Sequence, residues 1–201
     1  MNRTVGIVLF NDAEELDWAG PWEVLTAAAK DGDKVITVAE TLEPIRCAKG
    51  LRVLPDQTFD DAPDLDVILV PGGIGTRVEM ANVVLTDYVA DQAARAEWTT
   101  SVCTGSFILW AAGLLDGKRA TTHWAAIDEF LGIAPDLDLD REARWVVDGD
   151  VVSAAGVSAG IDMALWLVGQ LYDVQHARDT QRYIQYDPAP PYGVEQSPSA
   201  P

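Results

Sequence analysis

One cysteine, Cys103, stands between an expected strand, Thr99-Thr-Ser-Val102, and the start of a helix, Thr104-Gly105-Ser106. A strand, a sharp turn and a helix in this order are typical of a nucleophile that is held on a turn. The free N–H groups at a helix start favour thiolate over thiol, which would activate the sulfur. The alternative is a small buried hydrophobe, which is our interpretation of Cys47. The position of Cys103 at the turn favours a nucleophilic role.

An acidic cluster, Glu14-Glu15-Leu16-Asp17, could supply the group that transfers protons. It follows the first apolar run, and a carboxylate after the first strand of a parallel sheet can reach the crevice expected for Cys103. If Asp17 lay against the sulfur in a partly dry site, its pKa would rise and it could act as a general acid. The alternatives are solvated side chains in a loop, or a helix cap.

Backbone N–H groups and one histidine are further candidates for this site. Pro71-Gly72-Gly73 follows another apolar run, and the N–H groups of Gly73 and Thr104 are our candidates for stabilising an anionic intermediate. The alternative for the glycines is an ordinary turn. His123 could serve as an acid, a base, a helix cap or a packed core residue. The spacing of His, Cys and Asp residues matches no zinc site, and the glycines do not follow the dinucleotide-binding pattern. We therefore predict no metal and no cofactor.

Short apolar runs that alternate with helical segments predict the framework for these residues. Buried strands are expected at 5–10, 34–39, 66–70 and 99–102, and a hairpin at 145–153. Helices are expected from Pro21 to 29 and at 82–96, 105–112, 123–134 and 158–174, followed by a more polar helix to about 185. This order predicts an α/β fold with three layers: a parallel sheet with helices on both faces. In such folds ligands bind beyond the carboxyl ends of the strands.

The composition indicates a globular protein that binds a small molecule. The 201 residues are 48% hydrophobic, and 32 acidic against 14 basic residues give a net charge of −18, which disfavours nucleic acid and anionic membranes as partners. We find neither a run of about 18 apolar residues nor a signal peptide, so we expect a cytoplasmic protein. We predict one domain over 1–192 and a Pro- and Ser-rich tail over 193–201.

Taken together, these segments resemble the DJ-1/PfpI superfamily from about residue 4 to Tyr192. The resemblance implies a flavodoxin-like fold, similar to that of class I glutamine amidotransferases, with a nucleophile elbow at Cys103 and a homodimeric assembly. The matching segments are Val5–Phe10, Leu16-Asp17-x-x-Gly20-Pro21, Leu69–Gly73, Val102–Ser106, Ala111–Gly117, Ala120–Trp124 and Gly156–Asp162.

Within the superfamily, the chain is similar to the isonitrile (isocyanide) hydratase branch. Three features carry this likeness: Asp17 followed by Gly20-Pro21, the Cys103-Thr104 pair, and the segment Tyr186–Tyr192. The resemblance implies a lyase in which Cys103 attacks the terminal carbon of an isonitrile. Asp17 would be the acid/base partner and Thr104 would assist by hydrogen bonding. The product would be an N-substituted formamide, formed through a thioimidate.

Two other functions remain open within the same superfamily. The spacing of His123 from Cys103 suits a cofactor-free glyoxalase that acts on methylglyoxal. A non-enzymatic, redox-sensing or protective role would need only oxidation of Cys103. Asp17 together with Thr104 favours the hydratase. Thr104 stands where peptidases of the superfamily usually have histidine, which speaks against a protease.

Overall fold

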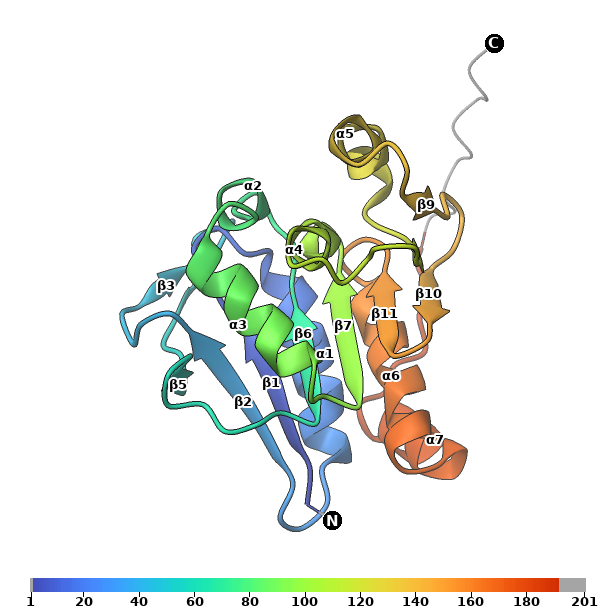
Figure 1. Ribbon diagram of the computed structural model, residues 1–201. Helices are drawn as coiled ribbons and strands as arrows, with labels where there is room; N and C mark the ends of the chain where they lie inside the picture. The colour runs from blue at the N-terminus through green and yellow to red at the C-terminus, as the bar shows by residue number, and fades with distance from the viewer. Residues whose placement is uncertain (1, 192–201) are drawn as a thin grey trace.

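A sheet of seven strands forms the centre of the structure, a computed structural model that describes residues 2–191 (Figure 1). The strand order is β10-β11-β7-β6-β1-β2-β5, and every neighbouring pair is parallel except β10 with β11. This arrangement confirms the predicted α/β class. The strands are Thr4–Val8 (β1), Lys34–Ala39 (β2), Gln57–Thr58 (β5), Val67–Val70 (β6), Trp98–Val102 (β7), Trp145–Asp148 (β10) and Val151–Ala154 (β11).

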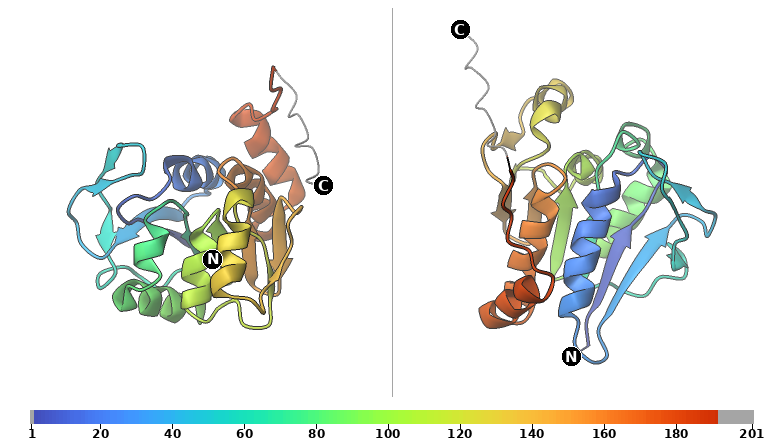
Figure 2. Two further views of the ribbon diagram at one scale, coloured as in Figure 1. Left: turned by 90° about the horizontal axis from the view of Figure 1, so that it is seen from above. Right: turned by 180° about the vertical axis from the view of Figure 1, so that it is seen from behind.

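Helices cover both faces of this sheet and complete the three layers. Helices α1, α6 and α7 pack together on one face, and α3 and α4 contact each other and β6 on the other (Figures 1 and 2). The order of these helices along the chain is Glu15–Ala28 (α1), Val83–Ala93 (α3), Gly105–Ala111 (α4), Ala159–Leu171 (α6) and Val174–Tyr183 (α7).

Smaller elements lie beyond the sheet. The short helices α2 and α5, with the 3-10 turn η1, lie toward the carboxyl ends of β6 and β7 (Figure 1). Two small sheets pair β3 with β4 antiparallel and β8 with β9 parallel. These elements span Thr76–Glu79 (α2), Trp124–Ala126 (η1), Ile127–Ile133 (α5), Ile45–Arg46 (β3), Arg52–Val53 (β4), Arg119–Ala120 (β8) and Asp138–Leu139 (β9).

The first helix begins earlier than the sequence suggested. We expected the helix to open at Pro21, but α1 begins at Glu15 and contains Pro21 in its interior. Pro21 has no N–H to give to the Asp17 carbonyl four residues earlier, which weakens the helix at that point. Contacts outside the helix hold the first turn instead: the Glu14 N–H donates to the Gly72 carbonyl at 2.8 Å, and Glu15 Oε1 accepts the Lys49 N–H at 2.8 Å. Asp17 therefore lies on a helix, not in a loop.

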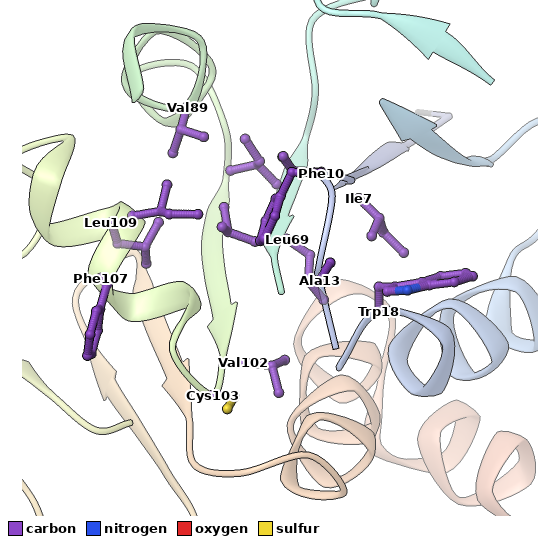
Figure 3. Close-up of a cluster of buried hydrophobic side chains, with 14 of the residues drawn as sticks. Ile7, Phe10, Ala13, Trp18, Leu69, Val89, Val102, Cys103, Phe107 and Leu109 are labelled. Atoms are coloured by element: carbon purple, nitrogen blue, oxygen red, sulfur yellow. The ribbon is translucent and has the colours of Figure 1, made fainter. Parts of the chain in front are cut away.

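Two apolar clusters hold the layers together. One lies between the sheet and helices α1 and α6, and includes Val24, Val67 and Leu167. The larger cluster includes Ile7, Leu69, Val89, Phe107 and Leu109, and Cys103 lies at its edge (Figure 3). The turn after β7 is thus fixed by packing on its inner side.

The C-terminal tail and the membrane-spanning potential of the helices are the last two features of the fold. The predicted Pro- and Ser-rich tail, 193–201, lies beyond the described residues. Across residues 2–191 the structure has no helix that is both long and apolar enough to span a membrane.

The tight turn before α4 generates a prediction about stability. A Cβ atom on Gly105 would lie 2.2 Å from the Val70 carbonyl oxygen and 2.9 Å from that of Pro71. Because these are backbone atoms, Gly105→Ala should cost about 1–3 kcal/mol of unfolding free energy. Gly132→Ala, on helix α5 with nothing within 4 Å of the added carbon, should be neutral or stabilise by up to about 1 kcal/mol. Urea denaturation of both variants measures the difference, and equal effects would contradict the packing described here.

Candidate active site

Cys103 occupies the turn between β7 and α4 in a strained backbone conformation. Its φ is 55°, in the left-handed region that a non-glycine residue rarely adopts. The Cys103 N–H donates to the carbonyls of Ala154 at 3.0 Å and Ala155 at 2.7 Å, at the end of β11. The residue is 7% exposed. Strand pairing and burial thus hold the sulfur at the carboxyl edge of the sheet.

Gly72 is the point at which the predicted residues come together. Its N–H donates to Asp17 Oδ2 at 2.9 Å. A Cβ atom on Gly72 would lie 2.8 Å from Asp17 Oδ2, 2.8 Å from Cys103 Cβ and 2.5 Å from the Thr104 nitrogen. Only glycine leaves room for this approach. The structure therefore brings Asp17, Cys103 and Thr104 to one place, as the sequence analysis expected.

Burial dominates the protonation of Asp17. The residue has no exposed surface, and its Oδ1 has no hydrogen-bond partner among residues 2–191. Burial raises the pKa of Asp17 from 3.8 to about 7, and the negative charge of Glu14 adds to the rise. The Gly72 N–H, the neighbouring Cys103 thiol and the charge of Lys49 oppose it. A carboxyl group with a pKa near neutrality can both give and accept a proton.

The thiol of Cys103 is also held in its protonated form. Burial and the charge of Asp17 raise its pKa to about 12, although the N–H and hydroxyl of Thr104 and the N–H of Val157 lower it. We expected the start of the helix to favour the thiolate, and burial outweighs that effect. Asp17 and Cys103 therefore keep one proton between them from about pH 7 to about pH 12.

Thr104 belongs to a hydrogen-bond network and does not bond to Asp17. Its Oγ1 accepts the Gly73 N–H at 3.1 Å and lies 3.1 Å from the Gly73 carbonyl, to which it donates. Thr76 Oγ1 lies 3.0 Å from Thr104 Oγ1 and 2.8 Å from the Gly73 carbonyl. The Gly73 N–H, our candidate for stabilising an intermediate, is thus engaged with Thr104.

A cavity of about 230 Å³ opens beside Cys103, and His123 lies on its wall. His123 Nδ1 accepts the Ala125 N–H at 3.3 Å, which makes it the cap of η1. Partial burial lowers the pKa of His123, so the ring is neutral near pH 7. The lining residues are Glu14, Gly73, Ile74, Arg77, Cys103, Thr104, His123, Ala125, Ala126 and Val157.

Sequence reasoning missed three residues around this site. Thr76 and Arg77 belong to helix α2, which is too short to produce a periodic pattern. Val157 has a φ of 41°, in the left-handed region that β-branched residues avoid. A valine at this position therefore gives no sequence signal for a turn. Cys47, by contrast, is fully buried as expected. Within residues 2–191 the structure groups no three His, Cys, Asp or Glu side chains in a way that could hold a metal ion.

The chain is similar to proteins of one known family. The family model described as the DJ-1/PfpI family matches residues 3–170. An isonitrile hydratase from Pseudomonas putida is 43% identical over 203 residues, which is 100% of this chain and 86% of that protein. A glutathione-independent glyoxalase from Caenorhabditis elegans is 28% identical over 163 residues, covering 80% of this chain and 83% of that protein.

A solved structure has the same fold. The crystal structure of a ThiJ/PfpI family protein from Pseudomonas syringae superposes with a TM-score of 0.90 and 35% sequence identity. The match covers 98% of this chain and 80% of that one.

The buried carboxyl group predicts that Asp17→Asn stabilises the protein. A pKa raised from 3.8 to about 7 lowers stability by roughly 4 kcal/mol once Asp17 is ionised. The folded protein binds this proton more tightly than the unfolded chain, so stability falls as pH rises from 3.8 toward 7. Asp17→Asn should therefore unfold at a higher urea concentration than the natural protein above pH 7, and the difference should vanish near pH 3.8.

Asp33 provides the matched control for this experiment. Slight burial raises its pKa, but hydrogen bonds from Tyr172 and from the backbone of Arg3 and Lys30 outweigh this and lower it. Asp33→Asn should therefore destabilise the protein at neutral pH. If Asp17→Asn also destabilises at every pH, Asp17 does not have the raised pKa described here.

Proposed function

Because the chain belongs to the DJ-1/PfpI family, we propose that it hydrates isonitriles to N-substituted formamides, with Cys103 as the nucleophile on an elbow between β7 and α4. The observation that carries the proposal is that Asp17 and Cys103, both buried, lie against each other at Gly72; this burial raises the pKa of both groups. The 43% identity to an isonitrile hydratase supports the same reaction.

The retained proton matches the first step. The Cys103 thiol gives its proton to the Asp17 carboxylate as the sulfur bonds to the terminal carbon of the isonitrile. Asp17 then delivers that proton to the same carbon, and the product is a thioimidate in which the carbon carries hydrogen, sulfur and the doubly bonded nitrogen. No proton leaves the site, which suits a buried acid/base group.

Water releases the product in the second step. Asp17, again a carboxylate, takes a proton from water as the oxygen bonds to the thioimidate carbon, and this proton passes to the nitrogen. The C–S bond then breaks, the remaining hydroxyl proton returns to the sulfur through Asp17, and the formamide leaves. One isonitrile and one water are consumed for each formamide, and the enzyme is regenerated.

Backbone donors stabilise the sulfur during attack. The N–H groups of Thr104 and Val157 both favour the thiolate form of Cys103. The Thr104 hydroxyl donates its one proton to the Gly73 carbonyl, and its bonds to Gly73 and Thr76 fix the position of the residue. The Gly73 N–H could serve a bound intermediate only after exchanging its bond to Thr104. Thr104 is therefore a catalytic residue mainly through its N–H.

His123 supports a second candidate, a cofactor-free glyoxalase. Its ring lines the same cavity as Cys103, and a named glyoxalase is 28% identical. Lactate formation from methylglyoxal tests this function, and mass spectrometry of Cys103 after mild peroxide treatment tests the redox-sensing alternative. The homodimer and the cytoplasmic location stay predictions of the sequence.

Removal of the thiol tests the proposal. Cys103→Ala should abolish formamide production from cyclohexyl isocyanide, and Cys103→Ser should do so too, because the hydroxyl is a far weaker nucleophile. Cys47→Ala removes the other thiol, which is buried away from the cavity lining, and should retain turnover. Gas chromatography of the formamide measures all three, and full activity in Cys103→Ala would rule out the covalent mechanism.

The pH dependence tests the role of Asp17. Only ionised Asp17 can accept the thiol proton, so kcat/KM should rise with pH through an apparent pKa of about 7 and then level off. Asp17→Asn should lose turnover by at least about 100-fold, typical for loss of a general acid/base group. A pH profile that rises near 3.8 instead would show that Asp17 is an ordinary carboxylate.

A further inference from the structure

Arg77, on the short helix α2, connects the interior of the site to its outer wall. The Cζ atom of its guanidinium lies over the Phe107 ring on α4, 5.0 Å from the ring centre. The Arg77 side chain is 31% exposed and also lines the cavity beside Cys103. The nitrogens of this one side chain divide into two sets with different partners.

The inner set reaches the network around Thr104. Arg77 Nη1 donates to the Gly73 carbonyl at 3.2 Å and lies 3.2 Å from Thr76 Oγ1. The same Gly73 carbonyl accepts the hydroxyl of Thr104 at 3.1 Å. Arg77 thus helps to fix the residue that follows the cysteine.

The outer set reaches helix α5. Arg77 Nε donates to Glu129 Oε1 at 3.0 Å, and Nη2 donates to Glu129 Oε2 at 2.5 Å. Such a bidentate pair fixes direction as well as distance, unlike a single exposed ion pair. Helix α5 follows η1 directly; η1 supplies Ala125 and Ala126 to one part of the cavity wall, and Ile74 and Arg77 supply another. The pair therefore ties the two walls of the cavity together; in Figure 1, α2 and α5 lie on either side of α4.

Resting on the proposed isonitrile hydration, we infer that the Arg77–Glu129 pair sets the width of the cavity and selects isonitriles with a compact, uncharged, apolar N-substituent. The cavity of about 230 Å³ is smaller than the pockets of roughly 300–1,000 Å³ that take drug-sized ligands. Ile74, Ala125 and Ala126 form an apolar part of its wall. The two charged side chains of the lining are paired, Arg77 with Glu129 and Glu14 with Lys49.

The two sets of contacts separate specificity from catalysis. Glu129→Gln loses only the outer ion pair, so it should change the preference for substrate size and leave kcat for a small isonitrile unchanged. Arg77→Lys loses the planar guanidinium whose N–H groups make both the inner and the outer contacts, so it should lower kcat as well. A residue with a merely structural role would not produce this split between KM and kcat.

Kinetics with methyl, cyclohexyl and naphthyl isocyanide test the inference. In Glu129→Gln the ratio of kcat/KM for naphthyl over methyl isocyanide should rise about three- to tenfold, as expected for a lost charge-assisted pair. Asp128→Asn is the matched control, because it removes the ion pair to Arg141 from the neighbouring position of α5. Asp128 is not among the cavity-lining residues, and its ratio should stay at the natural value.

A second readout does not depend on turnover. The rate of Cys103 alkylation by iodoacetamide, relative to a bulky naphthyl maleimide, follows access to the sulfur alone. Faster reaction with the bulky reagent in Glu129→Gln, but not in Asp128→Asn, supports the pair as the width-setting element. If that result appears while the natural protein hydrates none of the isonitriles, isonitrile hydration is overturned and the width-setting role stands. An unchanged size preference in both assays for Glu129→Gln overturns the inference.

Discussion

The burial of one carboxyl group against one thiol is the constraint on which the site depends. Asp17 has no exposed surface, and its Oδ2 is held by a single backbone N–H from Gly72. Water would stabilise the carboxylate far better than this surrounding does, so the proton is retained up to about pH 7. The same dryness keeps Cys103 protonated. Two groups that would be separately unremarkable in water thus become a pair that exchanges one proton.

Several non-glycine residues around this pair have backbone conformations that are rare for their residue types. Asp12, Cys103 and Val157 all have positive φ angles, and each lies just beyond the carboxyl end of a strand or in the turn that follows β11. Strained residues of this kind persist only where surrounding structure determines them. Here strand pairing, the glycine loop after β6 and the packing of α4 supply that determination. The sheet thus serves as the rigid frame, and the turns at its edge carry the chemistry.

Much of the fold followed from local patterns, because short buried strands and the hairpin leave strong signals. The strand Lys34–Ala39 matches its predicted bounds, and the pair of strands around Gly149 is the predicted hairpin. The predicted start of α1 at Pro21 was wrong. Hydrogen bonds to Gly72 and Lys49 fix the turn before Pro21, and a local sequence pattern does not show such long-range contacts.

The part of the site that lies in recognisable sequence motifs was predictable. Asp17, Cys103 and Thr104 lie in recognisable segments, and topology brings them together at Gly72. The partners of Thr104 were not predictable, because Thr76 and Arg77 act through distances set by the packing of α2. Nor could the sequence show that burial would outweigh the start of a helix in setting the state of the thiol.

The protonation of Asp17 can be observed directly by infrared spectroscopy. The difference spectrum between the natural protein and Asp17→Asn, followed across pH, isolates the carboxyl stretch of Asp17. A band from the protonated acid that persists through the acidic range and disappears with a midpoint near pH 7 is the predicted result. A midpoint near 3.8 would contradict the account, because Asp17 would then be too weak a base to take the proton of the buried thiol.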